Sequence, residues 1–170
     1  MDKVSGILKF AARMEKDARD FYNYYGDKVK SKELREIFNK MASIEELHHE
    51  YLTKRYEGLM QKEPPKELAW NIASDLAMKD PHILADTSNI LGENENGISD
   101  LMVIRMAYLI EKEFEEFYKN AVKIADDEVA KKILTELSVW EGQHKDYFEK
   151  QYEQLLSKNW EDAASILFAK

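Results

Sequence analysis

The sequence contains no cysteine among its 170 residues. Thiolate catalysis, zinc sites built on cysteine and iron–sulfur clusters are therefore excluded for this chain. Proline and glycine are also scarce, with 3 and 6 residues, and two of the prolines are the adjacent Pro64 and Pro65. Because these residue types are the main breakers of regular structure, we expect long uninterrupted helices.

Two further absences limit the partners and the location. The net charge is −8 and no basic cluster occurs, which argues against nucleic-acid binding. The longest apolar run, residues 101–110, is interrupted by Arg105 and is too short to cross a bilayer. Lys9 and Arg13 interrupt the apolar residues near the N-terminus, where a signal peptide needs a continuous run. We therefore expect a cytoplasmic protein that binds neither nucleic acid nor membrane.

Apolar residues recur at three- and four-residue steps in four stretches, at about residues 2–25, 31–61, 99–125 and 126–157. Ser31 and Asp127 are typical helix N-caps at the start of the second and fourth stretches. Asn159 suggests the N-cap of a short fifth helix within the tail 158–170. No stretch shows the alternation of a strand, so the fold class is all-α.

The connections predict how these helices are arranged. Two short connections flank a long one, the crossover at about residues 62–98. Short connections join antiparallel neighbours, so residues 2–61 and 99–157 should each form a helical hairpin. We expect one domain over residues 1–170, an antiparallel four-helix bundle.

The two hairpins are related by an internal repeat. A shift of 96 residues, from Glu15 to Glu111, aligns residues 14–22 with 110–118 and residues 37–52 with 133–148 without a gap. Six residues with metal-binding side chains then form three pairs: Glu15 with Glu111, Glu45 with Glu141, and His48 with His144. The overlapping pair Glu46 and His49 aligns with Gly142 and Lys145, so only the first Glu-x-x-His motif is duplicated.

The spacing gives these pairs a shared chemistry. Residues three apart on an α-helix project from the same face, one turn from each other, so each Glu-x-x-His motif can hold one metal ion. Four carboxylates and two imidazoles inside a bundle match a two-metal carboxylate site. Two divalent cations would cancel the four negative charges, and oxygen and nitrogen donors suit iron, with manganese and zinc as alternatives. The competing interpretation is solvated helix charges with two ordinary histidines.

At these residues the chain resembles the ferritin-like superfamily and, within it, the rubrerythrin-like proteins. The resemblance rests on IF-x-x-MA-x-x-EE-x-H, which begins at Ile37, and on the ME and FY residues of MEKDARDFY, residues 14–22. It implies two iron ions, with Glu45 and Glu141 bridging both. It also implies terminal ligands for each ion: Glu15 and His48 for one, Glu111 and His144 for the other.

Two departures from that family are visible. The resemblance implies a four-cysteine iron centre, which this chain cannot form. It also implies an extra Glu three residues after the third-helix ligand, where this sequence has Phe114. The next residue, Glu115, either replaces that carboxylate or is a surface residue. Tyr22 and Tyr118 lie two turns from their ligand glutamates and are the candidate catalytic residues. They hydrogen-bond ligand carboxylates on neighbouring helices, quench oxidising intermediates, or are plain core residues. Trp140 points away from the ligand face and is interpreted as a core residue.

Three functions are compatible with this site. The first is a di-iron oxidoreductase that acts on peroxide or dioxygen in the response to oxidative stress and takes electrons from an external donor. The second is a ferroxidase or iron-handling protein, and the third is a non-enzymatic helical module with structural metal. The repeated six-ligand set favours the first two, and we expect a homo-oligomer, in the simplest case a dimer.

Overall fold

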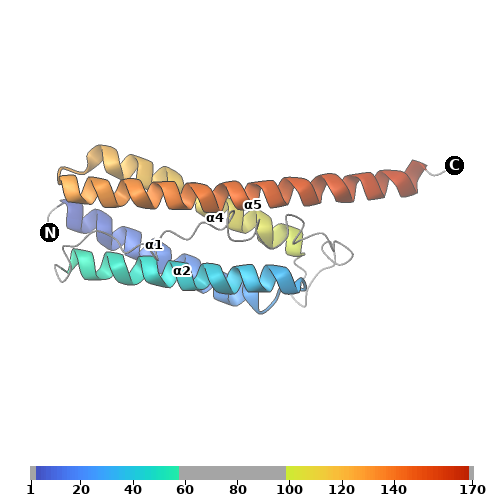
Figure 1. The fold of residues 1–170 in the computed structure, drawn as a ribbon, viewed down its shortest axis with the longest axis horizontal. Coiled ribbons are helices and arrows are strands. Elements are labelled where there is room, and N and C mark those ends of the chain that lie inside the picture. The colour runs from blue at the N-terminus through green and yellow to red at the C-terminus, as the bar shows by residue number, and fades with distance from the viewer. Residues whose placement is uncertain (1–2, 58–98, 169–170) are drawn as a thin grey trace.

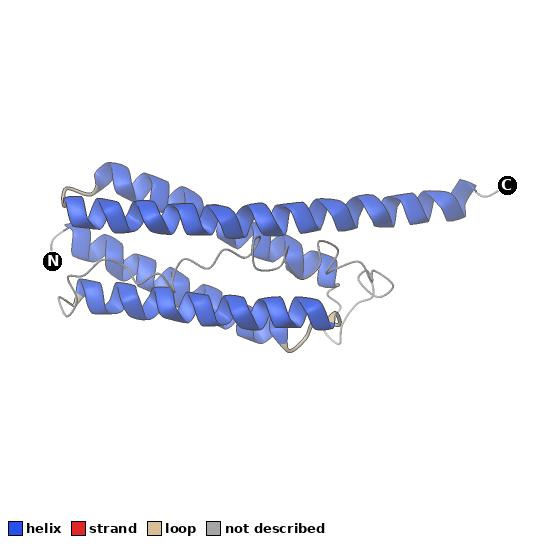
Figure 2. Ribbon diagram, in the orientation of Figure 1, coloured by secondary structure: helices blue, strands red, loops and turns tan. Residues whose placement is uncertain are grey.

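The structure is a computed structural model that describes residues 3–57 and 99–168. It contains four helices: α1 (Lys3–Gly26), α2 (Lys32–Tyr56), α4 (Asp100–Ile124) and α5 (Glu128–Phe168). All regular structure drawn for these residues is helical, as Figure 2 shows. The all-α, ferritin-like bundle that the sequence predicts is therefore confirmed.

The helices pack as two antiparallel hairpins. α1 packs along α2, α4 packs along α5, and α1 also contacts α4. α2 ends and α4 begins at opposite ends of the bundle (Figure 1). The predicted crossover at residues 62–98 lies outside the described residues, as does the expected continuation of the second helix past residue 57.

The predicted caps are present. The Ser31 hydroxyl accepts a hydrogen bond from the backbone N–H of Leu34 at 3.1 Å, and the Asp127 carboxylate accepts one from Ala130 at 2.7 Å. Each side chain satisfies a backbone donor that the first turn of a helix leaves without an intrahelical partner. Local chemistry that is readable in the sequence thus sets the starts of α2 and α5.

A buried carboxylate joins the two hairpins. Asp100, the first residue of α4, is 1% exposed. Its oxygens accept hydrogen bonds from the backbone N–H groups of Lys30 and Ser31, at 2.8–3.1 Å. These donors belong to the turn between α1 and α2, so Asp100 holds the start of the second hairpin against the turn of the first.

The predicted fifth helix is wrong as a separate element. Residues after Asn159 are helical, but they continue α5 without a break to Phe168. The Asn159 side chain does not cap a new helix; its Nδ2 donates to the carbonyl of Leu155 at 2.6 Å. No glycine or proline lies between Ser157 and Phe168, so nothing in the chain stops the helix. α5 therefore extends beyond the other three helices (Figure 1).

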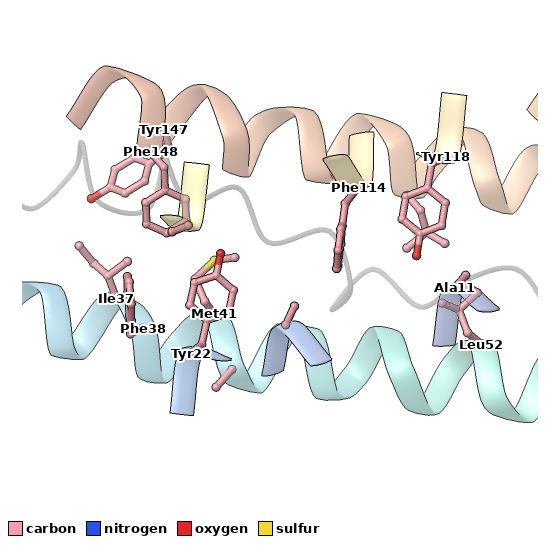
Figure 3. Packing of buried hydrophobic residues seen from close by; sticks show 14 of the residues in the cluster. Ala11, Tyr22, Ile37, Phe38, Met41, Leu52, Phe114, Tyr118, Tyr147 and Phe148 are labelled. Atoms are coloured by element: carbon pink, nitrogen blue, oxygen red, sulfur yellow. The ribbon is translucent and has the colours of Figure 1, made fainter. Parts of the chain in front are cut away.

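The core between the hairpins is largely aromatic and aliphatic (Figure 3). Tyr22, Phe38, Tyr118 and Phe148 are fully buried within it. None of the helices described has a stretch long and apolar enough to cross a membrane. The compartment stays a prediction.

Candidate metal centre

The six predicted ligands all lie inside the bundle, each with an exposure of 0%. They come from all four helices, one glutamate each from α1 and α4 and one Glu-x-x-His pair each from α2 and α5: Glu15, Glu111, Glu45 with His48, and Glu141 with His144. Charged side chains are almost never fully buried unless they are paired or bind metal. Six of them at one level of a helical core therefore mark a built site.

Around His48, three carboxylate oxygens lie close to the same ring nitrogen. Its Nδ1 lies 3.2 Å from Glu141 Oε1, 3.3 Å from Glu45 Oε2 and 3.5 Å from Glu15 Oε2. One ring nitrogen has a single hydrogen or a single lone pair, so it cannot bond three carboxylates at once. A cation among these atoms would satisfy all of them.

The second half repeats this arrangement around His144. Its Nδ1 lies 3.2 Å from Glu141 Oε2, 3.7 Å from Glu111 Oε2 and 4.0 Å from Glu45 Oε1. The two imidazole rings are nearly parallel, with their centroids 6.5 Å apart. The two histidines thus lie side by side at the centre, one from each hairpin.

Two overlapping sets of four side chains emerge, and within each set one donor atom per residue lies within 4.8 Å of every other. The first set is Glu15, Glu45, His48 and Glu141; the second is Glu45, Glu111, Glu141 and His144. Glu45 and Glu141 belong to both sets, and each of the other four belongs to one. This partition is the one that the resemblance implies, with two bridging carboxylates between two metal positions. That the six residues bind metal stays a prediction.

The donors fit a pair of divalent metal ions. Within the described part of the chain, no hydrogen bond reaches five carboxylate oxygens: Glu15 Oε2, Glu45 Oε1, Glu45 Oε2, Glu111 Oε2 and Glu141 Oε1. A buried carboxylate oxygen without a partner costs several kcal/mol. Carboxylate oxygen and imidazole nitrogen are the donors that iron, manganese and zinc accept in such sites. Metal binding would satisfy these oxygens and neutralise the buried charge.

The electrostatics of the metal-free cluster show how far it departs from ordinary side chains. Burial raises the pKa of Glu111 to about 7 and that of Glu45 well above its usual range, with the neighbouring Glu141 adding to the rise in both. Burial would also raise the pKa of Glu141, but the two imidazoles outweigh it and hold that pKa well below its usual value. Without metal, the cluster therefore keeps protons on some carboxyl groups at neutral pH.

Burial acts on the pKa values of the two imidazoles in the opposite direction. Burial would lower the pKa of His144, but the nearby carboxylates of Glu111 and Glu141 raise it to about 9. The same balance raises the pKa of His48 well above its usual range. The metal-free cluster is thus a set of carboxylates that share protons with two imidazoles, and metal ions would have to displace those protons.

Two tyrosines tie the hairpins together across the centre. Tyr22 of α1 donates its hydroxyl hydrogen to Glu111 Oε1 of α4, and Tyr118 of α4 donates to Glu15 Oε1 of α1. In Figure 3 the two hydroxyls point in opposite directions, each toward the other hairpin. Burial, followed by the nearby carboxylates, raises the pKa of both tyrosines well above the usual value, so both stay protonated donors. Of the alternatives for these tyrosines, the structure shows the hydrogen bonds to the predicted ligand carboxylates.

Trp140 has a contact that the sequence did not indicate. Its ring stacks on that of His48, with centroids 5.6 Å apart and planes 20° from parallel. It is partly buried against the core, as expected, but it also covers one imidazole of the centre. Its repeat partner is Ile44, so the two metal positions have different neighbours. Periodicity on one helix cannot reveal this contact, because it joins α5 to α2.

Three residues near the motifs lie outside the cluster. His49 Nδ1 is 2.6 Å from the backbone carbonyl of Ala12, and Glu46 pairs with Arg19. Glu115 pairs with Lys119 at 2.6 Å and with Lys145 at 3.0 Å, and it belongs to neither metal-binding set. Glu115 thus does not replace the extra carboxylate of the rubrerythrin-like pattern, whose position is occupied by the buried Phe114.

Comparisons with known proteins agree with this architecture. A family model described as Rubrerythrin matches residues 6–152. The chain is also similar to a solved structure from Pyrococcus furiosus that is described as a hypothetical protein, with 25% sequence identity and a TM-score of 0.62. That match covers 93% of this chain and 92% of the other. No curated protein matches the chain.

Proposed function

The chain belongs to the rubrerythrin family of ferritin-like di-iron proteins, and from this premise we propose that it is a di-iron oxidoreductase that reduces peroxide or dioxygen. The observation that carries the proposal is the pair of overlapping four-residue sets with two shared carboxylates. A structural metal site rarely needs two bridged positions, whereas two one-electron metal ions held side by side can together supply both electrons of a two-electron reduction.

A bound pair of ferrous ions would supply the two electrons that one peroxide takes up, together with two protons, to give two waters. The protein's part is to hold the donor set through that change. Glu45 and Glu141 belong to both donor sets, so they would hold both metal ions. His48 and His144 complete one position each.

Tyr22 and Tyr118 are positioning residues in this proposal. Each hydroxyl occupies one oxygen of a terminal glutamate and leaves the other oxygen, Oε2, directed at an imidazole of the cluster. A carboxylate whose second oxygen is held by a hydrogen bond keeps its orientation toward the metal. Because each tyrosine comes from the opposite hairpin, these bonds also fix the two half-sites against each other.

Re-reduction of the centre requires an electron donor outside this sequence, because a chain without cysteine cannot form the four-cysteine iron centre that the resemblance implies. We therefore propose an external reductant as the second partner. A homo-oligomer remains a proposal.

A single-turnover experiment tests the proposed function. The iron-loaded protein is reduced without oxygen and mixed with one equivalent of peroxide or dioxygen, and the near-ultraviolet absorption of the ferric product is followed. Oxidation that ends at two irons per chain, with no mineral formed, supports the oxidoreductase. Rapid dioxygen consumption with iron accumulating beyond two per chain would instead identify an iron-handling protein. Inertness to both oxidants would contradict the enzyme proposal and leave a metal-binding module.

A further inference from the structure

A cavity of about 400 Å³ opens between α1 and α4, outside the metal centre. Its walls include three pairs of residues related by the 96-residue repeat: Met14 with Ile110, Asp17 with Glu113, and Ala18 with Phe114. The metal centre also consists of three such pairs. Both features therefore straddle the same approximate twofold axis, and the cavity lies where that axis leaves the bundle between α1 and α4.

The order of the walls follows from helix geometry. At 3.6 residues per turn, Ala18 and Phe114 lie about 60° around their helices from the ligand glutamates. Met14 and Ile110 lie about 100° away, and Asp17 and Glu113 about 160° away. The sequence of layers is thus ligand carboxylate, then Ala18 and Phe114, then an apolar wall, then an acidic rim.

Burial agrees with this order. Glu15 and Glu111 are 0% exposed, Ala18 is 2% exposed and Phe114 is 8% exposed. The two rim carboxylates are exposed. Phe114 and its small repeat partner Ala18 are therefore the layer that separates the cavity from the ligands.

The two repeat-related residues of this layer, Ala18 and Phe114, differ in size, so the cavity is not symmetric here. α1 contributes a methyl group at Ala18, whereas α4 contributes the Phe114 ring, which extends from α4 into the space between the hairpins (Figure 3). A ring opposite a methyl group can close a passage by itself, and a change of its side-chain rotamer would open it. The barrier thus rests on one side chain.

The polarity and charge of the cavity lining favour some oxidants over others. An apolar wall accepts dioxygen, which has no strong hydrogen bonds to water to give up, more readily than a polar oxidant. The rim carboxylates of Asp17 and Glu113 repel anions. The cavity is thus suited to a small, neutral and apolar molecule.

We propose that the cavity between α1 and α4 is the route by which dioxygen reaches the metal centre, and that the Phe114 ring is the barrier on this route. The proposal rests on the proposed function and deepens it by naming the oxidant that this entrance admits best.

The first test needs no metal and uses dioxygen itself, which is paramagnetic. Nuclear magnetic resonance spectra of the metal-free protein are recorded under oxygen pressure. We expect the methyl groups of Met14 and Ile110 to relax faster than those of Ile7 and Val122, which are also partly buried against the core but do not line the cavity. In Phe114→Ala, the enhanced relaxation should extend to the ring protons of His48 and His144. Relaxation at Met14 and Ile110 no greater than at Ile7 and Val122 would overturn the route.

The second test uses nitric oxide as a small neutral probe of the ferrous protein. Its association, followed by stopped-flow absorption, should be faster by about tenfold or more in Phe114→Ala and slower in Ile110→Phe, which fills the cavity. Phe148→Ala, which removes a buried ring away from the cavity, is the matched control and should not accelerate association. Equal acceleration in both alanine variants would indicate general loosening of the bundle and would overturn the barrier role.

The outcomes separate this proposal from the proposed function. If the protein binds no iron, the proposed function fails, and the oxygen-pressure spectra still decide the route. If iron binds and is oxidised but neither Phe114→Ala nor Ile110→Phe changes nitric oxide association, the function stands and the route is wrong. Should Phe114→Ala not fold, Phe114→Leu and Ile110→Phe provide the same comparison, with faster entry expected in the first and slower entry in the second.

Discussion

At the scale of single residues, α2 carries two adjacent histidines with different environments. His48 is fully buried and lies 3.2–3.5 Å from three carboxylates. His49 is directed at the backbone carbonyl of Ala12 on α1, 2.6 Å away. One step along a helix turns a side chain by about 100°, so neighbours in sequence face different surroundings. The two residues should therefore have separable roles.

Substitution of these histidines tests the ligand assignment. The wild-type protein should bind about two ferrous ions per chain, and His48→Ala should lower this ratio because one position loses its imidazole. His49→Ala should keep the ratio and lose only about 1 kcal/mol of stability, the contribution of a typical hydrogen bond. Metal analysis and urea denaturation provide the two readouts. A lowered metal ratio in His49→Ala with His48→Ala unchanged would show that the repeat alignment is misleading.

The tyrosine hydroxyls provide a second prediction at this scale. In Tyr22→Phe or Tyr118→Phe, a buried carboxylate oxygen loses its donor while the ring remains in the core. Leaving a buried acceptor without its partner costs about 1–3 kcal/mol, so the metal-free variants should unfold at lower urea concentration. Metal affinity should fall by about 10–100-fold, as is usual when a group that orients a ligand is removed.

The control for this prediction is Tyr24→Phe, since Tyr24 is on the same helix as Tyr22 but is exposed. It should leave both stability and affinity unchanged. Equal behaviour of all three variants would mean that the two buried hydroxyls do not position Glu15 and Glu111.

At the scale of elements, the relation between the two hairpins depends on few polar contacts. Asp100 accepts hydrogen bonds from Lys30 and Ser31 at one end of the bundle, and the tyrosine–glutamate bonds cross between the hairpins at the centre. Apolar packing is nearly non-directional, so it brings helices together without setting how far one slides along another. Hydrogen bonds have preferred distances and angles, so they can set that register.

The Asp100 contact gives a prediction at this scale. Asp100→Ala removes a buried acceptor of backbone N–H groups in the α1–α2 turn, and the free energy of unfolding should fall by about 1.5–3 kcal/mol, as for other hydrogen bonds to charged groups. Chemical denaturation measures the change. Ser99→Ala is the matched control, because it removes only the N-cap of α4 and should cost about 1 kcal/mol. A loss no greater than that of the control would show that Asp100 serves only its own helix.

At the scale of the whole molecule, stability and metal binding are coupled through the same buried charges. Folding without metal confines four carboxyl groups and two imidazoles in one core. Metal ions that bind only the folded state then stabilise it by mass action. The metal-loaded protein should therefore have a higher free energy of unfolding than the metal-free protein.

The pH dependence of the metal-free form follows from the shifted pKa values. Burial raises the pKa of Glu111 to about 7, and its carboxylate neighbours raise that of His144 to about 9. A group whose pKa is raised on folding contributes stability below its unfolded pKa and loses it as the pH rises through the folded value. The pKa of Glu141 is lowered on folding, so its contribution to stability is lost only at acid pH and is constant across this range. Metal-free protein should thus lose stability from about pH 5 to about pH 9.

Metal binding should show the opposite trend, because the ligands must lose their protons first. The difference in melting temperature between loaded and metal-free protein should be small near pH 5.5 and should grow by about 5 °C or more by pH 8. Calorimetry of both forms across this range measures it. A difference that is constant with pH, or equal melting of the two forms at pH 7, would contradict a cluster of buried, convergent carboxylates.

The sequence alone determined the features that depend on local geometry. Helix periodicity identified the helical stretches, and cap chemistry at Ser31 and Asp127 located two helix starts because each cap acts within one turn. The 96-residue repeat selected the six converging residues, since two copies of one hairpin place equivalent side chains at equivalent depth. Where local signals were weak, prediction failed: Asn159 is compatible with both a cap and a helix interior, and α5 simply continues through it.

Only the tertiary structure decided the features that join separate elements. It showed that Trp140 covers His48, that each tyrosine hydrogen-bonds the glutamate of the opposite hairpin, and that Asp100 holds a distant turn. It also showed the cavity between α1 and α4 that Phe114 lines. These contacts depend on how far two hairpins slide and rotate against each other. Periodicity fixes which face of a helix is buried, but not which atoms of another helix it meets.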